Sequence, residues 1–218
     1  MKTILFQGDS ITDGKWSRNL PDNGNLGYRY PALVQGALGV KYPGEYKCLN
    51  RAVSGERSID ILARVKRDII NIKPDIFSLL CGINDCCDEP LKNGLSPEKY
   101  ETVLNILLAQ VKEALPEIKL IILTPALLHG SLTSSDSEHP GRWEKRSFDV
   151  NEINKVTLRV ARKYGAVVRE LQPLFDEQLK RAPDEYWMAD GIHPTAAGNQ
   201  IIKNAWLDAF EELRRDEK

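Results

Sequence analysis

Short apolar segments alternate with longer amphipathic segments along the whole chain. Each apolar segment has the length of a β-strand and stops at glycine, proline or polar residues, as strands do. The predicted strands are residues 3–7, 46–53, 75–81, 119–124 and 165–171. Residues 120–123 are continuously apolar, which is typical of a strand buried on both faces of a parallel sheet.

Between these segments, apolar residues recur at the three- and four-residue spacing of helices. The predicted helices are residues 28–38, 59–70, 97–115, 148–164, 174–181 and 195–215. Ser96 and Pro97 strengthen the third of them, because serine is a good N-cap and proline suits the first helical position. Strands alternating with helices favour a parallel sheet covered on both faces and joined by right-handed crossovers. We therefore predict an α/β fold with three layers, α/β/α.

Length and composition are those of an ordinary globular domain. The chain has 218 residues, of which 42% are hydrophobic and 28% charged. No linker, internal repeat or low-complexity tract divides it, so we expect one domain over residues 1–218. Thirty basic and 31 acidic residues give a net charge of -1. This balance argues against nucleic acid and against an anionic membrane surface as partners.

Neither a leader nor a metal site is visible in the sequence. The chain begins Met-Lys and passes directly into the first strand, and no apolar stretch approaches the ~18 residues of a membrane span. We expect a cytoplasmic protein whose four cysteines stay reduced. Cys86 and Cys87 are adjacent, but no C-x-x-C pair exists and the three histidines are scattered, so we expect no metal.

The stretch Gly8-Asp9-Ser10-Ile11-Thr12-Asp13-Gly14 directly follows the first strand. In an open parallel sheet, ligands bind at the carboxyl ends of the strands. A serine held there is exposed and fixed, as a nucleophile must be, and Gly8 leaves room beside it. The alternative is a helix cap or an Asx-turn, because Asp, Ser and Thr all favour such positions.

Polar or small residues also follow other predicted strands. Gly55 follows the second strand, Asn84 the third, and Asp190 and His193 come after the fifth. Acyl transfer needs a nucleophile, a base, a group that orients the base, and donors for the oxyanion. His193 would be the base for Ser10, and Asp190 would orient it. The backbone N–H groups of Ser10 and Gly55 and the side chain of Asn84 would be the donors. The alternatives are a capping aspartate, a surface histidine, a turn glycine and a loop-capping asparagine.

Four blocks in this order resemble those of the SGNH, or GDSL-like, hydrolase superfamily. The blocks are Gly8-Asp9-Ser10, Gly55, Gly82-Ile83-Asn84-Asp85 and Asp190-Gly191-Ile192-His193-Pro194. They span nearly the whole chain, and four ordered blocks are far more specific than any one of them. One departure is Ile11, where the name of the family expects leucine. We expect this side chain to pack inward.

The resemblance implies a fold and a set of roles. The fold is flavodoxin-like, with a five-stranded parallel sheet. Ser10 is the nucleophile, and Asp190 and His193 complete the triad. The N–H groups of Ser10 and Gly55 and the side chain of Asn84 form the oxyanion hole. No metal or other cofactor takes part in this chemistry.

Within the superfamily, residues 8–13, the pair Gly27-Tyr28 and the Gly-Ile-Asn-Asp block resemble intracellular acetylxylan-esterase-like members. This resemblance implies a serine esterase that removes acetyl groups from short sugars, so the partner is a small-molecule ester. It also implies a homo-oligomer. Trp16, Tyr28, Trp143 and Trp187 could stack on sugar rings or could belong to ordinary packing. Whether loops 15–27 and 131–146 line the pocket is left open.

Two alternatives remain at this point. A lysophospholipase or an acyl thioesterase would use the same triad with a different acyl pocket. A flavodoxin-like binding module would hold an anion or a nucleotide, but no glycine-rich phosphate loop follows the first strand.

Overall fold

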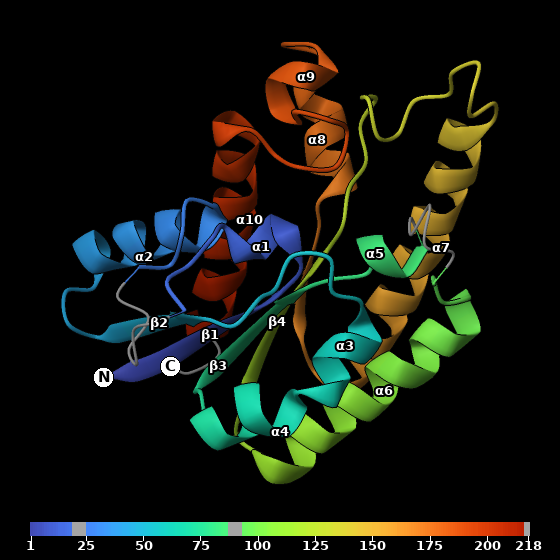
Figure 1. The fold of residues 1–218 in the computed structure, drawn as a ribbon. Coiled ribbons are helices and arrows are strands. Elements are labelled where there is room, and N and C mark those ends of the chain that lie inside the picture. The colour runs from blue at the N-terminus through green and yellow to red at the C-terminus, as the bar shows by residue number, and fades with distance from the viewer. Residues whose placement is uncertain (19–24, 87–92, 216–218) are drawn as a thin grey trace.

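A computed structural model describes residues 1–18, 25–86 and 93–215, and its centre is a five-stranded parallel sheet (Figure 1). The strands are β1 (Lys2–Gly8), β2 (Tyr46–Asn50), β3 (Ile76–Leu80), β4 (Lys119–Thr124) and β5 (Val167–Glu170). Their order across the sheet is β2-β1-β3-β4-β5. This is the flavodoxin-like order of a doubly wound fold, so the predicted fold class is confirmed.

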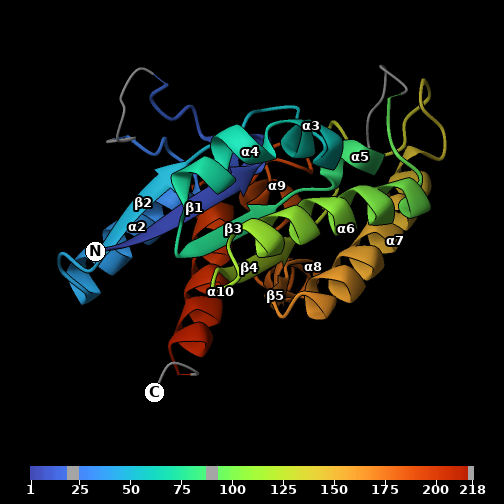
Figure 2. The ribbon, with the colours of Figure 1, turned by 90° about the horizontal axis from the view of Figure 1, so that it is seen from below.

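Helices cover both faces of the sheet. On one side lie α2 (Tyr30–Lys41), α8 (Gln172–Gln178) and α10 (Ala196–Arg215), and on the other α3 (Ser58–Ala63), α4 (Val65–Asp68), α6 (Pro97–Ala114) and α7 (Arg142–Lys163). Seen from below, α6 and α7 run side by side (Figure 2). The remaining short helices are α1 (Ser10–Asp13), η1 (Ile70–Ile72), α5 (Ile83–Cys86) and α9 (Asp184–Trp187).

Alternating side chains of each strand enter two separate cores. Ile121 and Leu123 of β4 pack on the side of α2 and α10, whereas Leu120 and Ile122 pack on the side of α6 and α7. This period of two is the geometry of a strand, and apolar residues at both phases explain the continuous run in the sequence. Ile11, only 3% exposed, packs inward as predicted.

The helices predicted over 28–38 and 174–181 are each displaced by two or three residues at both ends, and two other predicted helices differ more. The helix predicted over 59–70 consists of three short pieces, α3, α4 and η1. Arg64 leaves the helical conformation between the first two, and its guanidinium pairs with Glu56 on one side and Asp68 on the other. The helix predicted from residue 148 begins at Arg142, because the buried side chain of Arg146 extends the inward face by one more turn.

The carboxyl ends of the strands form the upper edge of the sheet in Figure 1, where α1, α5 and the segment between α9 and α10 come together. The strand order reverses between β1 and β3, whose last residues Gly8 and Leu80 pair in register. Ligands of open α/β sheets bind at such a reversal point. In the described part of the chain, no helix is both long and apolar enough to cross a bilayer.

Candidate active site

Ser10 is the first residue of α1, directly beyond the end of β1. Asp9 caps this helix, and its Oδ1 accepts a hydrogen bond of 2.9 Å from the N–H of Ile11. Gly8 is required by close packing, because a Cβ atom there would lie 2.2 Å from the carbonyl oxygen of Leu80 on β3. The capping interpretation is therefore correct for Asp9, and the cap fixes the residue that follows it.

His193 connects Ser10 to Asp190. The Oγ of Ser10 lies 2.8 Å from Nε2 of His193, and Nδ1 of His193 lies 2.7 Å from Oδ2 of Asp190. Ser10 and His193 are 183 residues apart in the chain. An imidazole held between a hydroxyl and a carboxylate can accept the proton of that hydroxyl.

The carboxylate of Asp190 is held by its own turn. Its Oδ1 accepts from the backbone N–H groups of Ile192 at 3.0 Å and His193 at 2.8 Å. Burial acts to raise the pKa of Asp190, but the hydrogen bonds from the His193 ring and from these two N–H groups outweigh it. The pKa falls to about 2, so the carboxylate stays ionised at any working pH.

The segment after β4 supports this turn. The N–H of Leu128 donates to the carbonyl oxygen of Gly191, and the N–H of Leu132 donates to that of Asp190, both at 3.0 Å. A Cβ atom at Gly130 would lie 2.2 Å from the carbonyl carbon of Asp190. Part of loop 131–146 therefore contacts the backbone of the Asp190–His193 turn. Residues 19–24 of loop 15–27 lie outside the described residues.

Gly55 and Asn84 come from the next two strand ends. Gly55 has a φ of +84° and is exposed, and no atom lies within 4 Å of where its Cβ would be. Asn84 lies on α5, and its Nδ2 donates to the carbonyl oxygen of Glu56 at 3.0 Å. Since Glu56 follows Gly55, this bond brings the asparagine amide beside the glycine loop. The amide keeps a second N–H for another acceptor.

Sequence reasoning missed three buried carboxyl groups at this edge, those of Asp9, Asp13 and Asp85. Burial raises the pKa of Asp9 to about 7, although a hydrogen bond from Ile11 and the proximity of His193 oppose this shift. Burial also raises the pKa of Asp85 to about 6. All three lie inside or beside the recognised blocks, but acidic residues are usually exposed and no sequence pattern marked these as buried.

The four candidate sugar-stacking aromatics have different environments. Trp187 is 7% exposed and belongs to the core, so it packs rather than presenting a face. Tyr28 is 60% exposed. Trp143 is partly buried and stacks on His129, with ring centroids 3.7 Å apart. Trp16 is also partly exposed. Three of the four therefore keep some exposed surface, although the guanidinium groups of Arg18 and Arg51 lie over the Trp16 ring.

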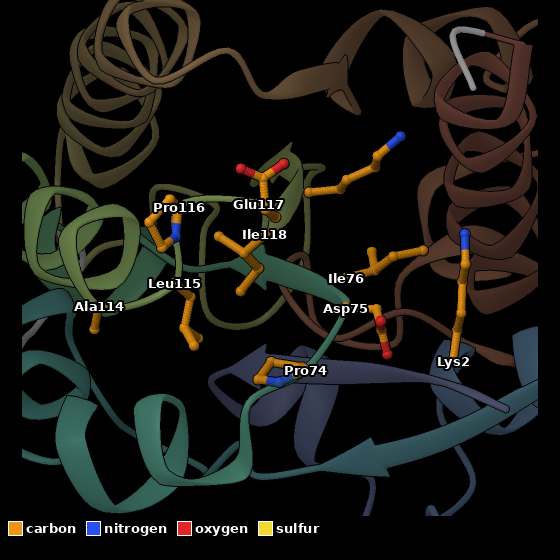
Figure 3. A pocket seen from close by; sticks show the side chains of 10 residues that line it. Lys2, Pro74, Asp75, Ile76, Ala114, Leu115, Pro116, Glu117 and Ile118 are labelled. Atoms are coloured by element: carbon orange, nitrogen blue, oxygen red, sulfur yellow. The ribbon is translucent and has the colours of Figure 1, made fainter. Parts of the chain in front are cut away.

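Two cavities are lined by residues other than those of the triad. One of about 480 Å³ is lined by Lys2, Asp75, Glu117 and their neighbours at the amino ends of the strands, the edge opposite Ser10 (Figure 3). The other, of about 520 Å³, lies between α7 and the end of β5 and includes Trp143. Within the described residues, His, Cys, Asp and Glu side chains form no group of three that could hold a metal ion. Cys87 lies outside those residues.

Comparisons with known proteins show the family of this chain. The sequence profile of the GDSL-like Lipase/Acylhydrolase family matches residues 6–201. An acetylxylan esterase of Geobacillus stearothermophilus is 32% identical over 97% of this chain and 95% of its own length.

Solved structures give the same result. The crystal structure of Axe2, an acetylxylan esterase from Geobacillus stearothermophilus, superposes with a TM-score of 0.81, at 29% identity, over 95% of this chain and 93% of the other. LAE5, an alpha/beta hydrolase enzyme from the metagenome of Lake Arreo, Spain, has a TM-score of 0.81 at 28% identity, over 95% and 94% of the two chains. The chain therefore belongs to the GDSL-like lipase/acylhydrolase family, has the SGNH hydrolase fold and is a carboxylic ester hydrolase.

Proposed function

We propose that the protein is a serine esterase that hydrolyses O-acetyl esters of carbohydrates with Ser10, His193 and Asp190 as its catalytic triad. The observation that carries this proposal is the continuous contact from Ser10 Oγ through the His193 ring to the Asp190 carboxylate, at 2.8 Å and 2.7 Å. It is the geometry that activates a hydroxyl for attack on an ester carbonyl.

The proposed reaction has two halves. Ser10 Oγ attacks the ester carbonyl carbon while His193 Nε2 takes the hydroxyl proton. Collapse of the tetrahedral intermediate breaks the bond to the sugar oxygen, which receives that proton. Water, deprotonated by His193, then attacks the acetyl-serine; the bond to Ser10 Oγ breaks, His193 returns the proton to that oxygen, and acetate is released. Asp190 keeps the ring in the correct tautomer and stabilises its charged form.

The negative charge that develops on the carbonyl oxygen requires donors. We propose that the N–H groups of Ser10 and Gly55 and the Nδ2 of Asn84 supply them. Their support is the register that ends β1 beside β3 and the bond from Asn84 to Glu56, which brings the loops after β2 and β3 together. Donors that are fixed before the reaction stabilise the transition state without reorganisation.

The substrate class is supported by the relatives. The esterase of Geobacillus stearothermophilus is also named an acetyl-xylooligosaccharide esterase, and its catalytic mutants include one serine and one histidine replaced by alanine. We extend this to the present chain as an O-acetylated sugar, a small-molecule ester. Trp16, Tyr28 and Trp143 are the exposed or partly exposed aromatic side chains that could stack on it.

An acyl-length series tests the proposal. Hydrolysis of p-nitrophenyl acetate, butyrate and octanoate would be measured beside acetate release from acetylated xylo-oligosaccharides, with Ser10→Ala as the control. We expect turnover that falls with chain length, release of acetate from the oligosaccharides, and loss of both in Ser10→Ala. A preference for octanoate would contradict the acetyl assignment and favour a lysophospholipase or a thioesterase.

The mechanism requires no metal ion or other cofactor. We expect kcat to be unchanged after dialysis against a chelator, because the nucleophile, the base and the oxyanion donors are all protein groups. Activity that disappears with the chelator and returns with a divalent cation would contradict this. The single-domain organisation, the cytoplasmic location and a homo-oligomer remain predictions.

A further inference from the structure

Two one-turn helices at the carboxyl edge, α1 and α5, combine the same two kinds of residue. Each carries one proposed catalytic group and one aspartate: Ser10 and Asp13 on α1, and Asn84 and Asp85 on α5. Asp13 is 4% exposed and Asp85 is fully buried. Carboxylates are rarely buried unless donors satisfy them, so the partners of these two indicate what they are for.

Asp13 holds the residue before Gly55. Its Oδ2 accepts from the N–H of Ser54 at 2.9 Å and from the Ser54 hydroxyl at 2.7 Å, and its Oδ1 pairs with Arg18 at 2.8 Å. Although burial acts to raise the pKa of Asp13, these donors lower it below its ordinary value. The charged form is therefore present at neutral pH, and hydrogen bonds to a charged acceptor are the stronger kind.

Asp85 holds the same loop on the other side of Gly55. Its Oδ1 accepts from the Ser58 hydroxyl at 2.6 Å, and its Oδ2 accepts from the N–H of Ser58 at 3.0 Å. Between the two serines, the carbonyl oxygen of Glu56 accepts from Asn84. Both aspartates thus bind a serine in the same way, through its N–H and its hydroxyl together.

Gly55 depends on these flanking bonds. Nothing lies within 4 Å of its Cβ position, and the residue is exposed, so no side-chain packing fixes its peptide group. Its φ of +84° is one that residues other than glycine rarely adopt. A turn closes around it, in which the N–H of Glu56 donates to the carbonyl oxygen of Val53 at 3.2 Å. The bonds to Ser54 and Ser58 hold this turn, and with it the Gly55 N–H, against α1 and α5.

We propose that Asp13 and Asp85 are positioning residues that fix loop 54–58 from both sides and so aim the Gly55 N–H at the oxyanion. This inference rests on the proposed oxyanion role of Gly55 and Asn84. It couples the donors to the nucleophile, because each aspartate shares a one-turn helix with Ser10 or Asn84. Displacement of the loop moves a donor relative to the attacked carbonyl, a change that affects the transition state more than substrate binding.

The experiment compares Asp13→Ala and Asp85→Ala with wild type in p-nitrophenyl acetate hydrolysis. We expect kcat to fall by roughly tenfold to a hundredfold with KM within about twofold, as for a catalytic donor held slightly out of place. Arg18→Ala is the matched comparison, since it removes the other partner of Asp13 and leaves Ser54 bonded; its kcat should fall by a smaller factor than that of Asp13→Ala.

Ser54→Ala and Ser58→Ala provide a milder pair of variants. Each removes one hydroxyl and keeps the backbone bond, so we expect a kcat loss of several-fold in a folded protein. If Asp13→Ala or Asp85→Ala does not fold, the serine variants test the proposal instead. Serine variants with wild-type kcat would overturn the proposal.

A double-mutant cycle separates positioning from general destabilisation. Asp85→Ala should lower kcat by a smaller factor in an Asn84→Ala background than in wild type, because part of its effect passes through Asn84. The role of Asp85 would be contradicted if the kcat loss of the double variant equalled the product of the two single losses, or if only KM changed. The result is separate from the proposed function: Ser10→Ala retaining activity would refute the triad, whereas a dead Ser10→Ala beside fully active Asp13→Ala and Asp85→Ala would refute only the positioning.

Discussion

The two edges of the sheet differ in where their charged side chains lie: in solvent at the amino edge, and buried at the carboxyl edge. The amino edge bears a cavity of about 480 Å³ lined by Lys2, Asp75 and Glu117, whose charged side chains are exposed (Figure 3). The carboxyl edge instead buries the carboxyl groups of Asp9 and Asp85. Burying a carboxyl group is costly unless hydrogen bonds satisfy it or it stays neutral.

The molecule therefore buries carboxyl groups, at a cost in free energy, beside its proposed active site. At the carboxyl edge, Asp9 caps the helix that begins with Ser10, and Asp13 and Asp85 bond the loop around Gly55. At the amino edge, charged side chains remain in water and fix no catalytic group. A cavity alone is therefore a weaker indication of function than a set of buried polar groups around a reactive side chain.

The largest effect is expected from removing a residue of the proposed triad. Ser10→Ala and His193→Ala should each lower kcat for p-nitrophenyl acetate by a factor on the order of 10⁵–10⁶, because the groups act as a unit. The double variant should lose little more than either single one. A Ser10→Ala enzyme within tenfold of wild type would show that another residue is the nucleophile.

Asn84→Ala should have the next largest effect. Loss of one oxyanion donor costs about a hundredfold to a thousandfold in kcat. KM should change little, because the donor acts on charge that develops only in the transition state. Steady-state kinetics of the purified variant measure both quantities, and an unchanged kcat would remove Asn84 from the oxyanion hole.

Asp9→Asn tests the burial of this carboxyl group through the pH dependence of stability. Burial raises the folded pKa of Asp9 from its ordinary value of 3.8 to about 7, so the folded state binds this proton more tightly than the unfolded state. Ionisation of Asp9 therefore makes a contribution that destabilises the folded wild type increasingly as pH rises from about 4 to about 7, while Asn, which still caps α1, carries no such charge.

Urea unfolding of wild type and Asp9→Asn at several pH values measures this effect. The free energy of unfolding of Asp9→Asn relative to wild type should rise between about pH 4 and about pH 7 and then level off. Groups that do not interact with Asp9 titrate alike in both proteins and cancel in the subtraction. Parallel profiles would mean that Asp9 is ionised throughout.

The smallest effect is expected at the amino edge. Glu117 is exposed and lines the cavity there. Glu117→Gln should leave kcat and KM unchanged and shift the free energy of unfolding by less than about 0.5 kcal/mol. A clear loss of ester hydrolysis in this variant would mean that the amino edge takes part in the activity.

Much of this architecture could be predicted from local pattern. The β4 prediction matches the observed strand at both ends, and the other strands differ only near their termini, because apolar runs and turn residues are local signals. Ser96 caps α6 as predicted, accepting from the N–H of Lys99. The four blocks also selected the residues that meet, Ser10, His193 and Asp190 among them.

What the sequence did not reveal depends on long-range contacts. Asp13 and Ser54 are 41 residues apart, and neither residue type signals that the two meet. At the break in the helix, Arg64 pairs with the carboxylates of Glu56 and Asp68, contacts that the apolar period of the segment does not encode. Burial of Asp9 and Asp85 follows only once the strand ends are packed together.

Covalent labelling of Ser10 tests the central claim most directly. Diethyl p-nitrophenyl phosphate transfers its diethylphosphoryl group to an activated serine, with a new Oγ–P bond and release of p-nitrophenolate. Peptide mass spectrometry after inactivation should find one label per chain, on the peptide that contains Ser10, and none on the Ser10→Ala protein. Stoichiometric labelling of a different residue, with loss of activity, would contradict the account.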